Sequence, residues 1–213
     1  MTPITYDLLN RLPKVELHCH LDGCLRPESM LEVADQDGIS LPLNNVAELD
    51  SFLRIGKKRG TLEDYLKRFD ITLSVMQTPE SLTRFAYELI EDVARENVRY
   101  LEVRYSPILH TKHGMTLEEA VESVLLGLKN GEKDFGVKSG IIVCGIRSIS
   151  PAISLKLADL SVQYKNRGVV GFDLAGAEEN FPAKEHREAF YLIRNNNINA
   201  TIHAGEAYGP ASI

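Results

Sequence analysis

The 213-residue sequence lacks the features that mark membrane-spanning, secreted and nucleic-acid-binding proteins. No run approaches the roughly 18 uncharged apolar residues that a transmembrane helix needs, so we expect no membrane partner. The amino-terminal residues MTPITYDLLNRLPK contain no apolar segment of the kind found in signal peptides. A net charge of −6 gives no basic surface for nucleic acid. We therefore expect neither secretion nor a nucleic-acid partner.

Cysteine is also scarce. Cys19, Cys24 and Cys144 are odd in number and lack CxxC spacing, so the sequence predicts no disulfide framework. Such usage is typical of a reducing compartment, and we expect a cytoplasmic protein. The sequence is 44% hydrophobic and 25% charged, which is ordinary for a soluble globular domain. A chain of this length forms one large domain more readily than two small ones.

Short apolar segments rich in β-branched residues alternate with segments of helical periodicity. The predicted strands are 14–20, 98–106, 138–146, 168–176 and 198–205, and the predicted helices are 27–36, 78–97, 116–136, 150–168 and 184–197. Thr78 and Thr116 stand where helix N-caps are expected, and Gly168 stands where a helix-ending glycine is expected. This order predicts a parallel sheet with right-handed crossovers.

Two parallel-sheet architectures fit this alternation. An open doubly wound sheet that binds a dinucleotide carries a Gly-rich loop after its first strand, whereas this strand ends in HCHLDG. In a closed TIM (β/α)8 barrel, functional residues lie at the carboxyl ends of the strands, which is where the histidines occur. We favour the barrel. Only about five strands are predicted and a typical barrel takes roughly 250 residues, so we expect residues 1–213 to form one incomplete barrel domain.

The segment at about 24–77, between the first two predicted strands, is too long for a simple loop and helix. We predict a helical insertion there. Leu62, Tyr65, Leu66 and Phe69 form an apolar stripe at helical spacing. Two interpretations stay open at this point. The stripe packs on the barrel rim, or the helix that carries it forms a lid over the site.

Two histidines stand one residue apart at the end of the first predicted strand, in VELHCHLDG. Side chains alternate along a strand, so His18 and His20 face one way and Cys19 faces the other. Alone, the pair fits either a metal site or two polar residues at a strand end. His203 at the end of the fifth strand, followed by Glu206, favours the metal site. Three neutral imidazoles with an open position are typical of catalytic zinc, and a nearby glutamate suits acid–base work.

Four stretches make the sequence recognisable: PKVELHCHLDGCLRPESML, ENVRYLEVRYSP, GVVGFDLAGAEE and HAGEAYGPASI. They closely resemble adenosine deaminases of the metal-dependent amidohydrolase superfamily, in the same order, from about residue 8 to the last residue. The resemblance implies a (β/α)8 barrel and hydrolysis of adenosine and 2′-deoxyadenosine to inosine and ammonia, a reaction of purine salvage. It implies a small purine nucleoside as substrate and one zinc ion as cofactor.

The resemblance also implies roles for individual residues. His18, His20 and His203 would bind the zinc ion. Glu206 would protonate the purine ring nitrogen beside the carbon under attack. This is not the cytidine type of zinc deaminase, which has HxE with PCxxC and cysteine ligands.

Three residues would bind the substrate by the same resemblance. Asp22 would accept a hydrogen bond from the ribose 5′-hydroxyl, the backbone at Gly176 would contact the purine, and His20 would lie against the substrate. Adenine deaminases resemble HLEG where this sequence has HLDG, so Asp22 favours a substrate that carries ribose. On local grounds Asp22 is also typical of an N-cap or turn. Adenine and modified adenosines stay alternative substrates.

The sequence departs from the family pattern at two points. Ala177 stands where many relatives have Asp. The family pattern also continues past HAGE with a further catalytic histidine and an Asp-Asp pair, which do not occur before Ile213. The remaining histidines are expected to be solvated and unable to replace them: His110, His113 and His186. The sequence thus resembles an amino-terminal fragment, which we expect to be inactive alone, and a non-catalytic metal-binding partial barrel is the alternative.

Overall fold

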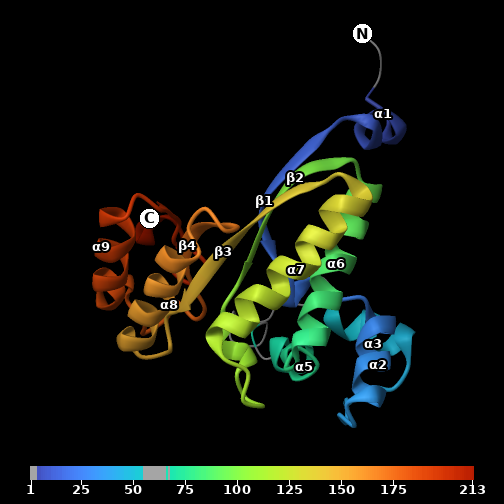
Figure 1. Ribbon diagram of the computed structural model, residues 1–213, viewed down its shortest axis with the longest axis horizontal. Coiled ribbons are helices and arrows are strands. Elements are labelled where there is room, and N and C mark those ends of the chain that lie inside the picture. The colour runs from blue at the N-terminus through green and yellow to red at the C-terminus, as the bar shows by residue number, and fades with distance from the viewer. Residues whose placement is uncertain (1–3, 55–65, 67) are drawn as a thin grey trace.

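A computed structural model describes residues 4–54, 66 and 68–213, and its centre is a five-stranded parallel sheet (Figure 1). The strands are β1 (Lys14–His20), β2 (Val98–Tyr105), β3 (Lys138–Ile146), β4 (Val169–Ala175) and β5 (Asn199–Ala200). Each strand pairs in parallel with the one before it in the sequence, in the order β1-β2-β3-β4-β5. Sequential order is the arrangement of a barrel and differs from the reversed order of a doubly wound sheet.

One helix, α1, precedes β1, and the other helices lie in the connections between the strands. They are α1 (Tyr6–Arg11), α2 (Pro27–Gln36), α3 (Val46–Leu53), α5 (Phe69–Ser74), α6 (Pro79–Arg95), α7 (Leu117–Phe135), α8 (Pro151–Gln163) and α9 (Arg187–Asn195). Figure 1 shows α6 beside α7, and α8 beside α9 at the other end of the sheet. The alternation confirms the predicted fold class, and the chain covers part of a (β/α)8 barrel. None of the described helices is long and apolar enough to cross a lipid bilayer.

The segment between β1 and α6 contains α2, α3 and α5. Arg26, just before α2, donates hydrogen bonds to Glu91 and Asp92 of α6 at 2.8 and 2.6 Å, which fastens this segment to the barrel helices. Two members of the predicted apolar stripe, Leu62 and Tyr65, lie outside the described residues. The assignment of residues 1–213 to one incomplete barrel domain stays a prediction.

Local capping explains where the long helices begin. The Thr116 side chain accepts a hydrogen bond from the backbone N–H of Glu119, whose carboxylate accepts one from the backbone N–H of Thr116. Thr78 caps α6 in the same way with Ser81. These two N-caps confirm the predictions made from the sequence.

Two predicted element ends were wrong. Helix α8 ends at Gln163 and does not extend to Gly168, because Asn166 adopts a left-handed φ of 64° that an α-helix cannot continue. The fifth strand was predicted over 198–205, whereas β5 is limited to Asn199–Ala200. Beyond β5 the chain still runs along β4, since the backbone N–H of His203 donates to the carbonyl of Leu174 at 3.0 Å.

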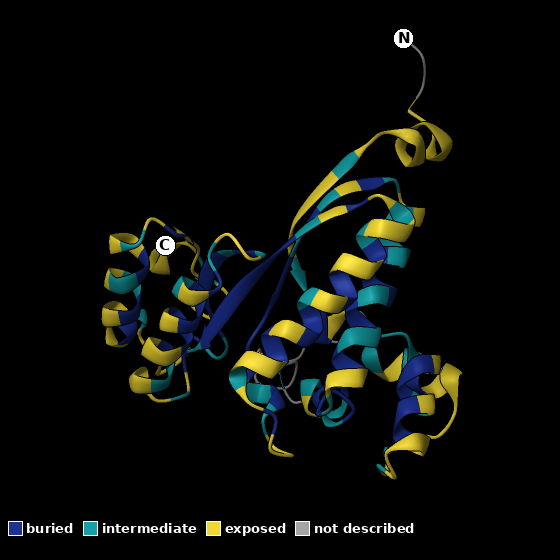
Figure 2. Cartoon of the chain, in the orientation of Figure 1, coloured by how far each residue is buried: buried dark blue, intermediate teal, exposed yellow. Residues whose placement is uncertain are grey.

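The hydrophobic core lies between the sheet and the helices. Leu101, Val103, Ile141 and Val143 of β2 and β3 are fully buried. Figure 2 shows β3 buried over most of its length, whereas β1 is largely exposed. Within the described residues β1 pairs with β2 alone, so one of its edges is free of strand pairing.

The prediction of solvated histidines was right for one residue and wrong for two. His113 is exposed. His110 is fully buried, with Nδ1 2.9 Å from the carbonyl oxygen of Met76. His186 is buried as well, with Nδ1 2.8 Å from the Ser154 hydroxyl and Nε2 3.2 Å from a backbone carbonyl. Both serve as internal hydrogen-bonding groups, which their loop and helix positions in the sequence do not reveal.

His110 should make folding sensitive to acid. Burial, with a smaller effect of Lys112, lowers the pKa of His110 from 6.5 to about 4, although the bond to the Met76 carbonyl opposes this. As the pH falls, the unfolded chain therefore takes up this proton first, and stability is lost between about pH 6.5 and pH 4. We expect His110→Asn, which keeps a donor for Met76 but cannot titrate, to reduce that loss by on the order of 3 kcal/mol. Urea unfolding at pH 7 and pH 4.5 measures the effect, and equal pH sensitivity in both proteins would contradict it.

Candidate metal centre and active site

Three histidines meet at the carboxyl ends of β1 and β5. Their Nε2 atoms lie close together: His18 to His203 at 2.9 Å, His20 to His203 at 3.1 Å and His18 to His20 at 3.3 Å. Among the described residues, this is the one group of three or more metal-binding side chains that could hold an ion. The structure thus brings together the three histidines that strand alternation and the HAGE sequence suggested.

The backbone explains how these side chains converge. His18 and His20 end β1 on one face of the strand, while Cys19 packs against the hydrophobic core from the other. His203 is held beside β4 by its N–H bond to Leu174 and by Arg147, whose guanidinium donates to the His203 carbonyl at 2.6 Å. The positions are therefore fixed by the sheet and by a buried arginine.

The donor set fits a zinc ion. Nitrogen ligands about 2.0–2.1 Å from a tetrahedral zinc lie roughly 3.3 Å from one another, close to the separations seen here. Burial, and then the neighbouring His203 and His18, lower the pKa of His20 to about 4. Burial also lowers the pKa of His18. Both imidazoles are therefore neutral near pH 7, which is the state that binds metal.

Asp173 contacts His203 on the side away from the other two histidines. The sequence did not identify this residue as part of the site. Its Oδ2 atom lies 2.8 Å from His203 Nδ1, on the ring edge opposite the shared centre. Asp173 is fully buried, and it accepts hydrogen bonds from Thr201 at 2.8 Å and Arg104 at 3.1 Å. Burial opposes ionisation of Asp173, but His203, Thr201 and Arg104 hold its pKa well below the usual range. A carboxylate there orients the imidazole so that its Nε2 atom faces the Nε2 atoms of the other two histidines.

Asp173 had a signal in the sequence. It interrupts the apolar run VVGFDLA of β4, where a charged residue is costly unless it is paired. A lone acid within a predicted buried strand therefore indicates a partner, although the sequence does not show that the partner is His203.

Asp22 lies beside the triad of His18, His20 and His203, and one of its carboxylate oxygens accepts no hydrogen bond. It is 7% exposed, its Oδ1 atom has no hydrogen-bond partner, and that atom is 4.0 Å from His20 Nδ1. Burial raises the pKa of Asp22 to about 7. An unpaired oxygen in a cavity wall is suited to a hydrogen-bond donor from a ligand. Asp22 sits within the short 3-10 turn Leu21–Gly23 and does not cap a helix by its side chain.

The cavity around the triad has a volume of about 400 Å³. All six residues singled out from the sequence line it: His18, His20, Asp22, Gly176, His203 and Glu206. Leu66 and Phe69 of the predicted apolar stripe line it too, so these two members face the site. Ala177 also contributes to the wall, beside the backbone of Gly176.

Gly176 and Gly205 provide backbone shapes that other residues rarely adopt. Gly176 has φ +92°, and a Cβ atom there would approach Ile146 to 3.1 Å. Gly205 has φ +84° at the turn between His203 and Glu206. Glycine is therefore required where β4 and the HAGE segment turn into the cavity.

Glu178 holds the loop that carries Glu206. Its carboxylate accepts hydrogen bonds from the backbone N–H groups of Gly205 at 3.0 Å and Ala207 at 2.7 Å, and from the Ser212 hydroxyl. These bonds, that of Ser212 first, lower the pKa of Glu178 to about 2, so it is ionised at neutral pH. The exposed Glu206 side chain lines the cavity from a loop that is fixed on both sides.

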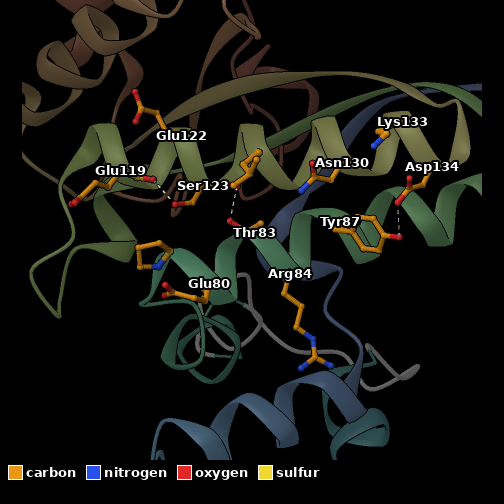
Figure 3. A pocket seen from close by; sticks show the side chains of 12 residues that line it. Glu80, Thr83, Arg84, Tyr87, Glu119, Glu122, Ser123, Asn130, Lys133 and Asp134 are labelled. Atoms are coloured by element: carbon orange, nitrogen blue, oxygen red, sulfur yellow. Dashed lines mark hydrogen bonds between the residues drawn. The ribbon is translucent and has the colours of Figure 1, made fainter.

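A larger groove of about 950 Å³ lies elsewhere, along the outer surface between α6 and α7 (Figure 3). Its walls carry paired groups: Tyr87 donates to Asp134 at 3.1 Å, and Thr83 donates to the Ser123 carbonyl at 3.0 Å. No histidine or cysteine lines it, and its carboxylates do not gather around one point. Size alone therefore does not identify the site, and the cavity at the triad is the candidate.

Comparisons with known proteins identify the family of this chain. A family model described as adenosine deaminase matches residues 13–213. A curated adenosine deaminase from Mycobacterium ulcerans is 44% identical over 215 aligned residues, which cover 98% of this chain and 59% of that protein. The chain therefore spans less than two thirds of the length of the curated relative.

Solved structures show the same partial coverage. An amidohydrolase with bound zinc from Burkholderia ambifaria has a TM-score of 0.82 and 27% identity, covering 95% of this chain and 56% of its own. An adenine deaminase from Arthrobacter aurescens has a TM-score of 0.80 and 29% identity, and the match covers 92% of this chain and 58% of that protein. An N6-mAMP deaminase from Arabidopsis has a TM-score of 0.81 and 26% identity, and the match covers 97% of this chain and 63% of that protein.

Proposed function

Because the chain belongs to the adenosine deaminase family, we propose that the whole protein, meaning the complete reading frame that contains this chain, is a zinc-dependent purine-nucleoside deaminase. Its reaction is the hydrolysis of adenosine and 2′-deoxyadenosine to inosine and ammonia, as part of purine salvage. The observation that carries the proposal is the convergence of three imidazole Nε2 atoms on a cavity that also contains Asp22 and Glu206. Its volume of about 400 Å³ is within the usual range for small-molecule sites.

We assign His18, His20 and His203 to one zinc ion. Zinc bound at such a site lowers the pKa of its water to roughly 7 and so supplies a nucleophile at neutral pH. Asp173 keeps His203 in the tautomer whose Nε2 is free to bind metal. The family match and the zinc-bound amidohydrolase with a similar fold support this assignment.

Glu206 is assigned to proton transfer, and two neighbours to substrate binding. Glu206 gives its proton to the purine ring nitrogen beside the reacting carbon, which makes that carbon more electrophilic. Asp22 accepts a hydrogen bond from the ribose 5′-hydroxyl through its unpaired oxygen. The backbone at Gly176 lies against the purine, where a side chain would fill the cavity wall.

The alternative within the same chemistry is deamination of adenine or a modified adenosine. The similar folds of an adenine deaminase and an N6-mAMP deaminase favour it. Their identities of 29% and 26% are well below the 44% identity to the curated adenosine deaminase, so adenosine is preferred. We also propose a cytoplasmic location, which the three cysteines without disulfides support.

Ammonia release by the whole protein on adenosine, 2′-deoxyadenosine and adenine tests the proposal. We expect turnover of both nucleosides, little turnover of adenine, and loss of activity after chelation that added zinc restores. The preference follows from Asp22, because a buried acceptor that loses its ribose partner penalises the free base. Comparable or better turnover of adenine would contradict the role of Asp22, and turnover that survives complete metal removal would contradict the whole proposal.

A further inference from the structure

Two cysteine thiols lie in contact on the face of β1 opposite the histidine cluster, although the sequence spacing gave no indication of a pair. Cys19 Sγ is 3.4 Å from Cys24 Sγ. Cys19 belongs to β1 and Cys24 follows the 3-10 turn Leu21–Gly23, which reverses the chain and brings the two side chains together. A disulfide has an S–S length of about 2.05 Å, so the sulfur atoms would need to approach by only about 1.4 Å to bond.

The two thiols are also accessible. Cys24 is exposed and Cys19 is partly buried, so a small oxidant reaches the pair from the Cys24 side. The third cysteine, Cys144, differs from this pair because it is buried, with 1% of its surface exposed. Its sulfur lies 3.6 Å from the carboxylate of Asp173, and neither of the other two cysteines lies beside it in the structure. The chain therefore contains a contacting pair of thiols, exposed at Cys24, and a buried thiol that serves as an internal reference.

We propose that Cys19 and Cys24 form a reversible modification site, at which a peroxide oxidises the pair to an intramolecular disulfide. One thiol of the pair reacts with hydrogen peroxide to give a sulfenic acid and one water molecule. The other sulfur then attacks it, the S–S bond forms, and the sulfenic oxygen leaves as a second water. Two thiols lose two electrons and two protons in total, and a dithiol reductant returns them.

The position of the cross-link gives it a consequence for the metal centre. The ring closed by the bond contains His20 and Asp22, one imidazole of the cluster and the unpaired carboxylate of the cavity. Drawing Cys24 toward Cys19 shortens the turn that carries Asp22, whereas Cys144 lies outside that ring. The oxidation state of the pair is thus linked to the shape of the cavity wall.

Mass spectrometry of the whole protein tests the proposal without any activity measurement. The native, reduced protein is treated with hydrogen peroxide at low protein concentration, blocked with a thiol reagent and digested. We expect a peptide cross-link between Cys19 and Cys24, an unmodified Cys144, and return of both thiols after dithiothreitol. Cys144→Ser should form the same cross-link. Cys24→Ser should form none, and should instead leave Cys19 as a free or singly oxidised thiol.

The proposal is overturned if both thiols stay free at peroxide concentrations that oxidise free cysteine. It is also overturned if oxidation stops at sulfinic acid on Cys24, or if the cross-links formed are between two chains. Because the readout is the chemical state of the sulfur atoms, failure here leaves the proposed deaminase function untouched. Failure of the deaminase assay likewise leaves the thiol result standing.

Discussion

Replacing His203 by alanine should remove the metal from the whole protein and abolish measurable deamination. In the proposed site the imidazole is one of three nitrogen donors, whose Nε2 atoms lie 2.9–3.3 Å apart. Removing a residue that only orients a ligand typically lowers metal affinity about 10–100-fold. Removing the ligand itself should therefore lower the affinity by more than about 100-fold. Zinc content after dialysis, and zinc affinity by competition with a chromophoric chelator, measure the effect directly.

The matched control is His113→Ala, which removes an exposed imidazole outside the cluster. Its zinc content and turnover should equal those of the unmodified protein, because the side chain takes no part in the cavity. Thermal unfolding of both variants separates metal loss from misfolding. A folded His203→Ala protein that keeps stoichiometric zinc at unchanged affinity would remove His203 from the ligand set.

The cluster could be predicted from the sequence because it follows from strand geometry. Alternation places His18 and His20 on one face of β1. In a barrel the carboxyl ends of all strands lie at the same end, so β1 and β5 can share a site although they are at opposite edges of the sheet. The structure places His203 beside the other two histidines even though the strand that precedes it is shorter than predicted. The ladder of hydrogen bonds along β4 continues to His203 after the formal strand ends at Ala200.

Contacts between distant segments could not be predicted in this way. Asp173 meets His203, and Glu178 meets the loop of Glu206, across 30 and 28 residues of sequence, through polar contacts that no local pattern encodes. The buried positions of His110 and His186 have the same origin. Each is polar and lies in a loop or helix end, so the sequence indicated solvent, but neighbouring elements cover it and form a hydrogen bond with its Nδ1 atom.

The second large effect concerns proton transfer. Glu206→Gln in the whole protein keeps the size of the side chain but removes the acidic proton, so the rate on adenosine should fall by about 10² or more. Zinc content should be unchanged, because the proposed ligands are the three imidazoles and do not include Glu206. Steady-state ammonia release and metal analysis on the same preparation measure both quantities, and the loss should appear in kcat more than in KM.

Glu179→Gln is the matched control, since it makes the same chemical change on an exposed neighbour of the loop-holding Glu178. It should leave rate and zinc content unchanged. Two results for Glu206→Gln would contradict the assignment in different ways. Loss of zinc would mean that Glu206 is a metal ligand, whereas an unchanged rate would mean that another group carries the proton. Because Glu178 fixes the backbone on both sides of Glu206, a change confined to this carboxyl should not move the loop, so a lower rate with zinc retained reports on the proton itself.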